Sequence, residues 1–131
     1  MTIPATIRPD HHERLAVFYG RQGTPDLGSA EYQWRQTGYA REWGWSEERI
    51  RWLHDFGRSG AAAEHRPQYR EMRRLLQAGQ VGLLGVVDLS RLARDCAELR
   101  SILTDCITHD VLVAIDGKIS SPRAILSDMA L

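Results

Sequence analysis

The chain has few of the residues and segments that define several large classes of protein. Its 131 residues include two cysteines, Cys96 and Cys106, both in one expected helix. Ten helical positions span about 15 Å, which is beyond the reach of a disulfide bond. A disulfide-stabilised secreted fold is therefore excluded, and we expect a reduced, cytoplasmic protein.

Long apolar runs and an excess of one charge are also missing. No segment approaches the roughly 18 apolar residues of a membrane span, and the first residues lack the basic and apolar regions of a signal peptide. Seventeen basic residues balance 17 acidic ones, so no overall field attracts nucleic acid. Lysine is almost absent, because Lys118 is the one basic residue that is not arginine.

What is present is typical of a single globular domain. Hydrophobic residues make up 43% and charged residues 26% of the chain. Residues 1–13, with two prolines and no apolar periodicity, are expected to form a flexible arm, and residues 14–131 one domain.

Strand and helix signals alternate along that domain. Strands are expected at 15–19, 49–55, 81–87 and 111–115. Helices are expected from Ser29 or Ala30 to about Trp43, from Pro67 until Gly79, and from about Asp95 to Thr108. The tail predicts at most a turn or two of helix. This alternation predicts an α/β fold, a three-layer α/β/α sandwich around a mainly parallel sheet of four to five strands.

Arginines gather in the segments that follow the expected strands. The set comprises Arg21, Arg58, Arg66, Arg91 and Arg94. Arg91 and Arg94 would share a face if they were helical. The carboxyl ends of parallel strands meet at one edge of the sheet, where binding sites form. Either these arginines scatter over the surface as solvated charges, or they converge on an anion, for which phosphate fits best.

Other motifs are weak. Gly57 to Gly60 is not followed by the Gly-Lys-Ser/Thr of a phosphate-binding loop, and the histidines lack metal-ligand spacing. We therefore expect no metal and no cofactor. The four tryptophans are expected in the core rather than in a base-stacking surface; they are Trp34, Trp43, Trp45 and Trp52.

Over residues 14–117 the chain resembles the catalytic domain of serine recombinases, the resolvase/invertase family. Tyr19 to Thr24 is similar to that family's Tyr-x-Arg-x-Ser-Thr motif, and Leu89 to Asp95 resembles its Leu-Ser/Asp-Arg-Leu-x-Arg signature. Further similarities lie at Gln33, at Asp55-x-Gly57-x-Ser59-Gly60 followed by Arg66-Pro67, and at Asp116-Gly117.

The resemblance implies site-specific DNA recombination. In this family a serine attacks a DNA phosphodiester, forms a phosphoserine link, and strands are exchanged between two dimers. It assigns a catalytic role to Arg21, Arg66, Arg91 and Arg94 as a phosphate clamp and to Gln33, and DNA contacts to Tyr19, Arg58 and Ser90.

The main departure from the family lies at Gly23, where the nucleophilic serine is expected. Glycine has no hydroxyl, so no covalent link can form there. Thr24 is the possible substitute nucleophile, although a shift of one residue points a side chain elsewhere. We therefore predict a recombinase-type domain that does not cleave DNA.

A second departure is that residues 14–131 lack the long dimerisation helix and the DNA-binding domain of the family. The expected partners are DNA and a homo- or hetero-oligomer with a recombinase, and no membrane. The alternatives are a non-catalytic DNA-binding or regulatory partner of an active recombinase, an enzyme that uses Thr24, and a fold remnant with no role on nucleic acid.

Overall fold

A five-stranded sheet forms the centre of the protein in the computed structural model, which describes residues 3–22, 30–56 and 66–129. The order across the sheet is β2-β1-β3-β4-β5. The first four strands are parallel, and β5 runs antiparallel to β4. The strands are β1 (Leu15–Gln22), β2 (Ile50–Phe56), β3 (Val81–Val86), β4 (Leu112–Ile115) and β5 (Lys118–Ser120).

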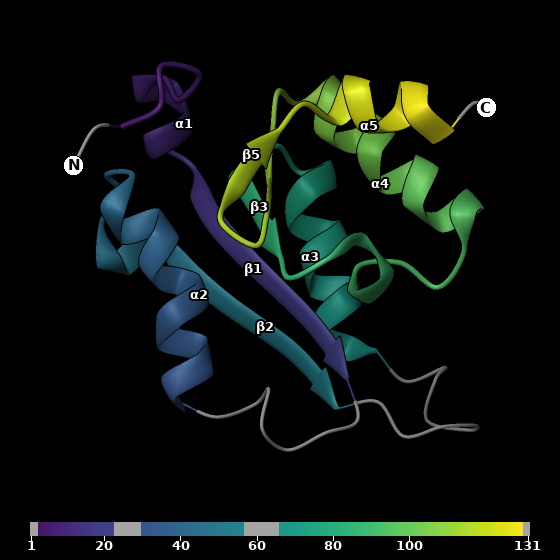
Figure 1. Ribbon diagram of the computed structural model, residues 1–131, viewed down its shortest axis with the longest axis horizontal. Coiled ribbons are helices and arrows are strands. Elements are labelled where there is room, and N and C mark those ends of the chain that lie inside the picture. Colours follow the sequence, from purple (N-terminus) through teal and green to yellow (C-terminus); the bar gives the residue numbers. More distant parts are fainter. Residues whose placement is uncertain (1–2, 23–29, 57–65, 130–131) are drawn as a thin grey trace.

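Helices cover both faces of this sheet. In Figure 1, α2 lies on one side, and α3, α4 and α5 lie on the other. The α-helices are α1 (Pro9–His12), α2 (Ala30–Glu42), α3 (Pro67–Gln77), α4 (Cys96–Thr108) and α5 (Pro122–Met129), with single 3-10 turns η2 (Glu47–Arg49) and η4 (Leu89–Arg91). The predicted three-layer α/β/α architecture is confirmed.

The two cores follow from the alternation of side chains along β1. Val17 and Tyr19 point into the core beneath α3 and α4, whereas Ala16 and Phe18 point into the core beneath α2. Every residue of β3 is buried, as expected for a central strand with helices on both faces. Gly85 of β3 is required because a Cβ atom there would collide with the Phe18 ring.

The amino-terminal segment differs from the expected flexible arm. Ile7 and His11 are buried, and α1 packs against β1 and β3. The approach is so close that a Cβ atom on Gly82 would overlap the backbone oxygen of His11. This burial depends on contacts with residues distant in the sequence, so no local pattern in residues 1–13 predicts it.

Two further expectations need correction in part. The tail forms the expected short helix, α5 with eight residues, which is about two turns and packs on α4, but it also forms the strand β5, which was not expected there. Trp43 and Trp45 are buried and Trp52 packs against their core, but Trp34 is 64% exposed on α2. The Arg41 guanidinium lies 3.6 Å from the centre of the Trp34 ring and covers part of it.

Within the described residues, none of the helices is long and apolar enough to cross a membrane.

Candidate functional site

The carboxyl ends of β1 and β2 are tied to the start of α3 by Asp55. The Tyr19 hydroxyl donates to Asp55 Oδ2 at 2.8 Å, and the backbone N–H groups of Gln68 and Tyr69 donate to the same carboxylate at 3.0 and 2.9 Å. A carboxylate at a helix amino terminus is stabilised by these free N–H groups and by the helix dipole. Asp55 therefore sets the position of α3 relative to the two strands.

Tyr19 is buried within this arrangement. Burial and the neighbouring Asp55 carboxylate raise the pKa of the Tyr19 phenol, so the hydroxyl stays neutral and donates to Asp55. Tyr19 is 2% exposed in this arrangement, and the DNA contact expected of it stays a prediction.

Arg66 is the residue immediately before α3, and its side chain is held from two directions. Its guanidinium carbon lies 3.7 Å from the centre of the Tyr69 ring. Its Nη2 and Nη1 atoms donate to Glu98 Oε1 on α4, at 2.9 and 3.2 Å. Arg66 is 6% exposed, and its buried Nε has no hydrogen-bond partner among the described residues. A buried guanidinium with an unmade hydrogen bond is costly, and such groups are common at binding sites.

Glu98 also connects Arg66 with Arg94. The backbone N–H of Arg94 donates to Glu98 Oε1 at 2.8 Å, and Arg94 Nη2 lies 4.0 Å from Glu98 Oε2. Asp95 caps α4 by accepting from the Glu98 N–H at 2.8 Å. The Arg94 guanidinium remains 57% exposed, so it can still bind a ligand that approaches from solvent.

The backbone brings the other two predicted clamp positions to the same edge. Arg21, near the end of β1, pairs in register with Asp55 of β2. Arg91 ends η4, which packs against β1. The structure describes the backbone of Arg21 and Arg91 and not their side chains. Arg91 and Arg94 do not share a helix, because η4 ends at Arg91 and α4 begins at Cys96.

The remaining predicted site residues are placed less closely or not at all. Gly23, Thr24 and Arg58 lie outside the described residues. Gln33 is exposed on α2, and the Ser90 hydroxyl donates to the Asp88 carboxylate. Their proposed roles stay predictions.

Glu98 is the residue of the candidate site that sequence reasoning missed. The sequence interpretation gave the arginines no counter-ion except phosphate, whereas Arg66 pairs with this carboxylate. The signal was the spacing of Arg94 and Glu98, four residues apart at the start of a helix, where a carboxylate is favoured.

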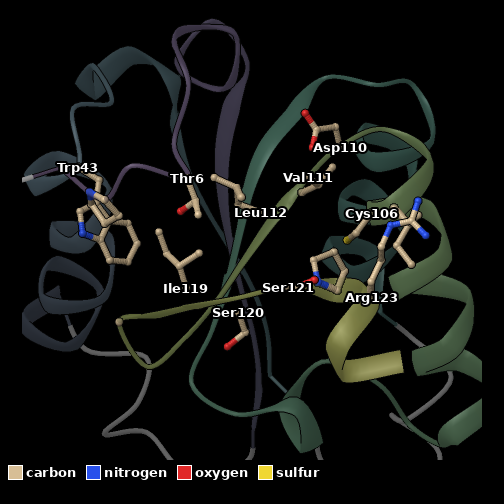
Figure 2. A pocket seen from close by; sticks show the side chains of 14 residues that line it. Thr6, Trp43, Cys106, Asp110, Val111, Leu112, Ile119, Ser120, Ser121 and Arg123 are labelled. Atoms are coloured by element: carbon tan, nitrogen blue, oxygen red, sulfur yellow. The ribbon is translucent and has the colours of Figure 1, made fainter. Parts of the chain in front are cut away.

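A pocket of about 650 Å³ lies elsewhere, beside the start of β4 and the end of β5 (Figure 2). Trp43 and Ile119 line one side, and Cys106 and Arg123 line the other. Because Val111 and Leu112 lie at the amino end of β4, the pocket is separate from the arginine edge.

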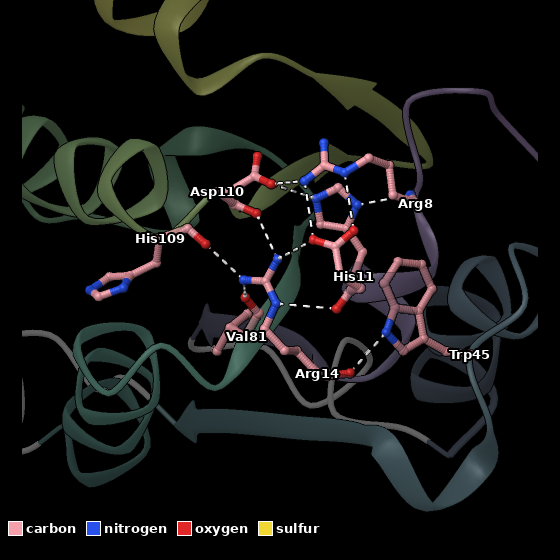
Figure 3. A network of polar contacts seen from close by, with 8 residues as sticks. Arg8, His11, Arg14, Trp45, Val81, His109 and Asp110 are labelled. Carbon is pink, nitrogen blue, oxygen red and sulfur yellow. Dashed lines mark hydrogen bonds and ion pairs between the residues drawn. The ribbon is translucent and has the colours of Figure 1, made fainter.

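A polar network joins the amino-terminal segment to the start of β3 and β4 (Figure 3). The Arg14 guanidinium donates to the backbone oxygens of Val81, His109 and Asp110, at 2.7, 2.7 and 3.0 Å. Ligand atoms of Asp10, His11 and Asp110 lie within 4.8 Å of one another. Arg8 pairs with both carboxylates and Arg14 lies near Asp10, so the two negative charges are already neutralised and would not attract a cation.

Comparison with known proteins agrees with the observed fold. The family described as "Resolvase, N terminal domain" matches residues 16–124. None of the curated protein sequences matches the chain. A resolvase family site-specific recombinase from Streptococcus pneumoniae is 27% identical, with a TM-score of 0.65 over 89% of this chain and 86% of that one.

Two more distant structures share the fold. The amino-terminal catalytic domain of TP901-1 integrase is 22% identical, with a TM-score of 0.58 and 88% of each chain covered. A serine recombinase from Sulfolobus solfataricus is 18% identical, with a TM-score of 0.53, 88% of this chain and 77% of that one. The family match spans most of the sequence and includes residues of all five strands; the chain therefore belongs to the resolvase family, as a catalytic domain of site-specific DNA recombination.

Proposed function

We propose that this domain binds a DNA phosphate at the carboxyl edge of its sheet and does not cut the strand. Arg66 and Arg94, joined by Glu98, form the described part of the clamp, and Arg21 and Arg91 complete it. The observation that carries the proposal is the buried Arg66 guanidinium, whose Nε has no partner among the described residues. A phosphate oxygen is the natural acceptor for such a group.

The chemistry of the proposed clamp is electrostatic. In phosphoryl transfer, negative charge on the phosphate oxygens shifts in the transition state, and cations fixed in advance stabilise it. Arg66 is fixed by Glu98 and by the Tyr69 ring, so it needs little reorganisation to meet that charge. These groups suit the family reaction, for which the missing component is a nucleophile.

The absence of cleavage follows from Gly23. A covalent phosphoserine link needs a hydroxyl, and this position offers only a hydrogen atom. Thr24 would have to reach the same in-line geometry from the next position, so we do not expect it to replace the serine.

A domain that binds phosphate without cutting suits a role beside an active recombinase. We place it in the cytoplasm, on DNA, as a member of a homo- or hetero-oligomer. Gly23 is the feature that favours this regulatory role over an independent enzyme.

The proposal is tested by incubating duplex DNA with four versions of the protein: the unaltered chain, Gly23→Ser, Arg66→Ala and the control Arg74→Ala. Arg74 is an exposed arginine of α3 that pairs with Glu71 of the same helix, so its loss removes a charge without touching the clamp. A native gel measures binding and a denaturing gel detects a covalent adduct.

We expect the unaltered chain and Arg74→Ala to bind equally, and Arg66→Ala to bind about tenfold or more weakly, as for loss of one charge-assisted contact. We expect an adduct with Gly23→Ser and none with the unaltered chain. An adduct with the unaltered chain that disappears with Thr24→Ala would contradict the proposal and show that Thr24 is the nucleophile.

A further inference from the structure

One carboxylate oxygen organises two of the arginines at the site. Glu98 Oε1 accepts from Arg66 Nη1, from Arg66 Nη2 and from the backbone N–H of Arg94, at 3.2, 2.9 and 2.8 Å. The Glu98 side chain is 15% exposed, so solvent screens these contacts only weakly. The same residue is fixed through its own N–H by Asp95.

Glu98 contacts one edge of the Arg66 guanidinium and leaves a second edge without a hydrogen bond. Nη1 and Nη2 form the terminal edge, which faces the carboxylate, whereas Nε belongs to the side edge. Tyr69 covers one face of the group at 3.7 Å. With one face and the terminal edge held, the edge that carries Nε is the part of the buried guanidinium left without a hydrogen-bond partner among the described residues.

We propose that Glu98 is a positioning residue, which holds Arg66 by its terminal nitrogens so that the Nε edge receives the DNA phosphate. The inference rests on the proposed function and adds a residue to it. Because carboxylate and phosphate use different edges, Arg66 binds both at once. Through the Arg94 N–H, Glu98 also sets the backbone from which the second arginine extends.

A competing role would give the opposite result on substitution. If Glu98 only occupied Arg66 in place of phosphate, its removal would free the guanidinium and strengthen binding. If it positions Arg66, its removal lets the guanidinium move and weakens binding, although a negative charge near the phosphate is lost. At metal sites, loss of a residue that orients a ligand commonly lowers metal affinity or activity by 10- to 100-fold, and we expect an effect of the same order here.

The test measures the affinity of the full chain for inorganic phosphate, at constant ionic strength kept with chloride. The variants are Glu98→Ala, Glu98→Asp and Glu98→Gln. Asp95→Asn is the matched control, since it removes a carboxylate at the same helix start while its amide oxygen can still cap Glu98. Circular dichroism establishes folding, and the ¹⁵N signal of Arg66 Nε reports contact with phosphate.

We expect Glu98→Ala and Glu98→Asp to bind phosphate about tenfold more weakly, the second because its carboxylate is one methylene too short. Glu98→Gln keeps the phosphate affinity of the unaltered chain, since its amide oxygen accepts the same three hydrogen bonds. Asp95→Asn binds phosphate at least as tightly as the unaltered chain. Phosphate shifts the Arg66 Nε signal in the unaltered chain and in Glu98→Gln.

The inference is overturned if folded Glu98→Ala binds phosphate as tightly as the unaltered chain, or if Asp95→Asn weakens binding equally. Should Glu98→Ala fail to fold, Glu98→Asp decides by the same criterion. If the unaltered chain and Arg66→Ala bind phosphate equally, the result contradicts the proposed function itself and not only the role of Glu98.

Discussion

At the scale of single residues, His11 shows how a titratable group can become part of a core. The side chain is completely buried, and Nδ1 accepts from the backbone N–H of Arg8 at 2.9 Å. The ring proton therefore lies on Nε2, which faces Asp110 Oδ2 at 3.4 Å. Burial lowers the pKa of His11, and the nearby Arg8 and Arg14 charges act in the same direction, against Asp110 and Asp10.

This arrangement predicts loss of stability in mild acid. A histidine whose pKa is lowered by folding binds its proton more readily in the unfolded chain, so the free energy of unfolding decreases as pH falls through the ordinary value of 6.5. Protonation of Nδ1 also removes the bond from the Arg8 N–H. Urea unfolding at pH 7.5, 6.5 and 5.5 measures the effect.

In His11→Gln we expect a lower stability at pH 7.5 and a shallower decrease towards pH 5.5. Some decrease remains, because burial also lowers the pKa of His54. An unchanged pH dependence in this variant would show that His11 is not the group responsible.

At the scale of elements, the link between β1, β2 and α3 depends on Asp55. Asp55→Ala leaves two helix N–H groups and the Tyr19 hydroxyl without their acceptor, so we expect a loss of about 3 kcal/mol in the free energy of unfolding. Tyr19→Phe removes one of the three bonds and should cost about 1 kcal/mol. Urea unfolding compares the two, and an equal or larger loss in Tyr19→Phe would contradict this account.

The elements also show what the sequence could predict. All four expected strands and three expected helices form close to their predicted positions, because their apolar spacing and their Pro67 and Gly79 boundaries are local signals. The strand β5 was missed because it has three residues. Its signal was Asp116-Gly117, which both adopt positive φ, 46° and 80°, in the two-residue turn between β4 and β5.

The site was predictable in part for a similar reason. The arginines are visible as residues that follow strands, and parallel topology brings them to one edge. The burial of Arg66 and its pairing with Glu98 depend on how α3 and α4 pack. Such contacts between helices cannot be predicted from the spacing of residues in the sequence.

At the scale of the whole molecule, charge is balanced overall and concentrated locally. With 17 basic and 17 acidic residues, we expect the proposed DNA affinity to come from the clamp and not from a general field. A clamp that neutralises one or two phosphates predicts a slope of log affinity against log salt between about −1 and −2. Binding to duplex DNA over a range of chloride concentrations measures that slope. A slope steeper than about −4 would indicate an extended basic surface instead.

The order of the sheet sets a condition on how the chain is made. β1 is synthesised before the other four strands of this sheet, yet its neighbours are β2 and β3, so its second partner is finished only at Val86. The edge of β1 that pairs with β3 therefore has no partner while some 60 further residues are synthesised, which takes about 3 to 12 seconds at 5–20 residues per second. The strand that carries Tyr19 and Arg21 therefore exposes an unpaired, aggregation-prone edge during synthesis.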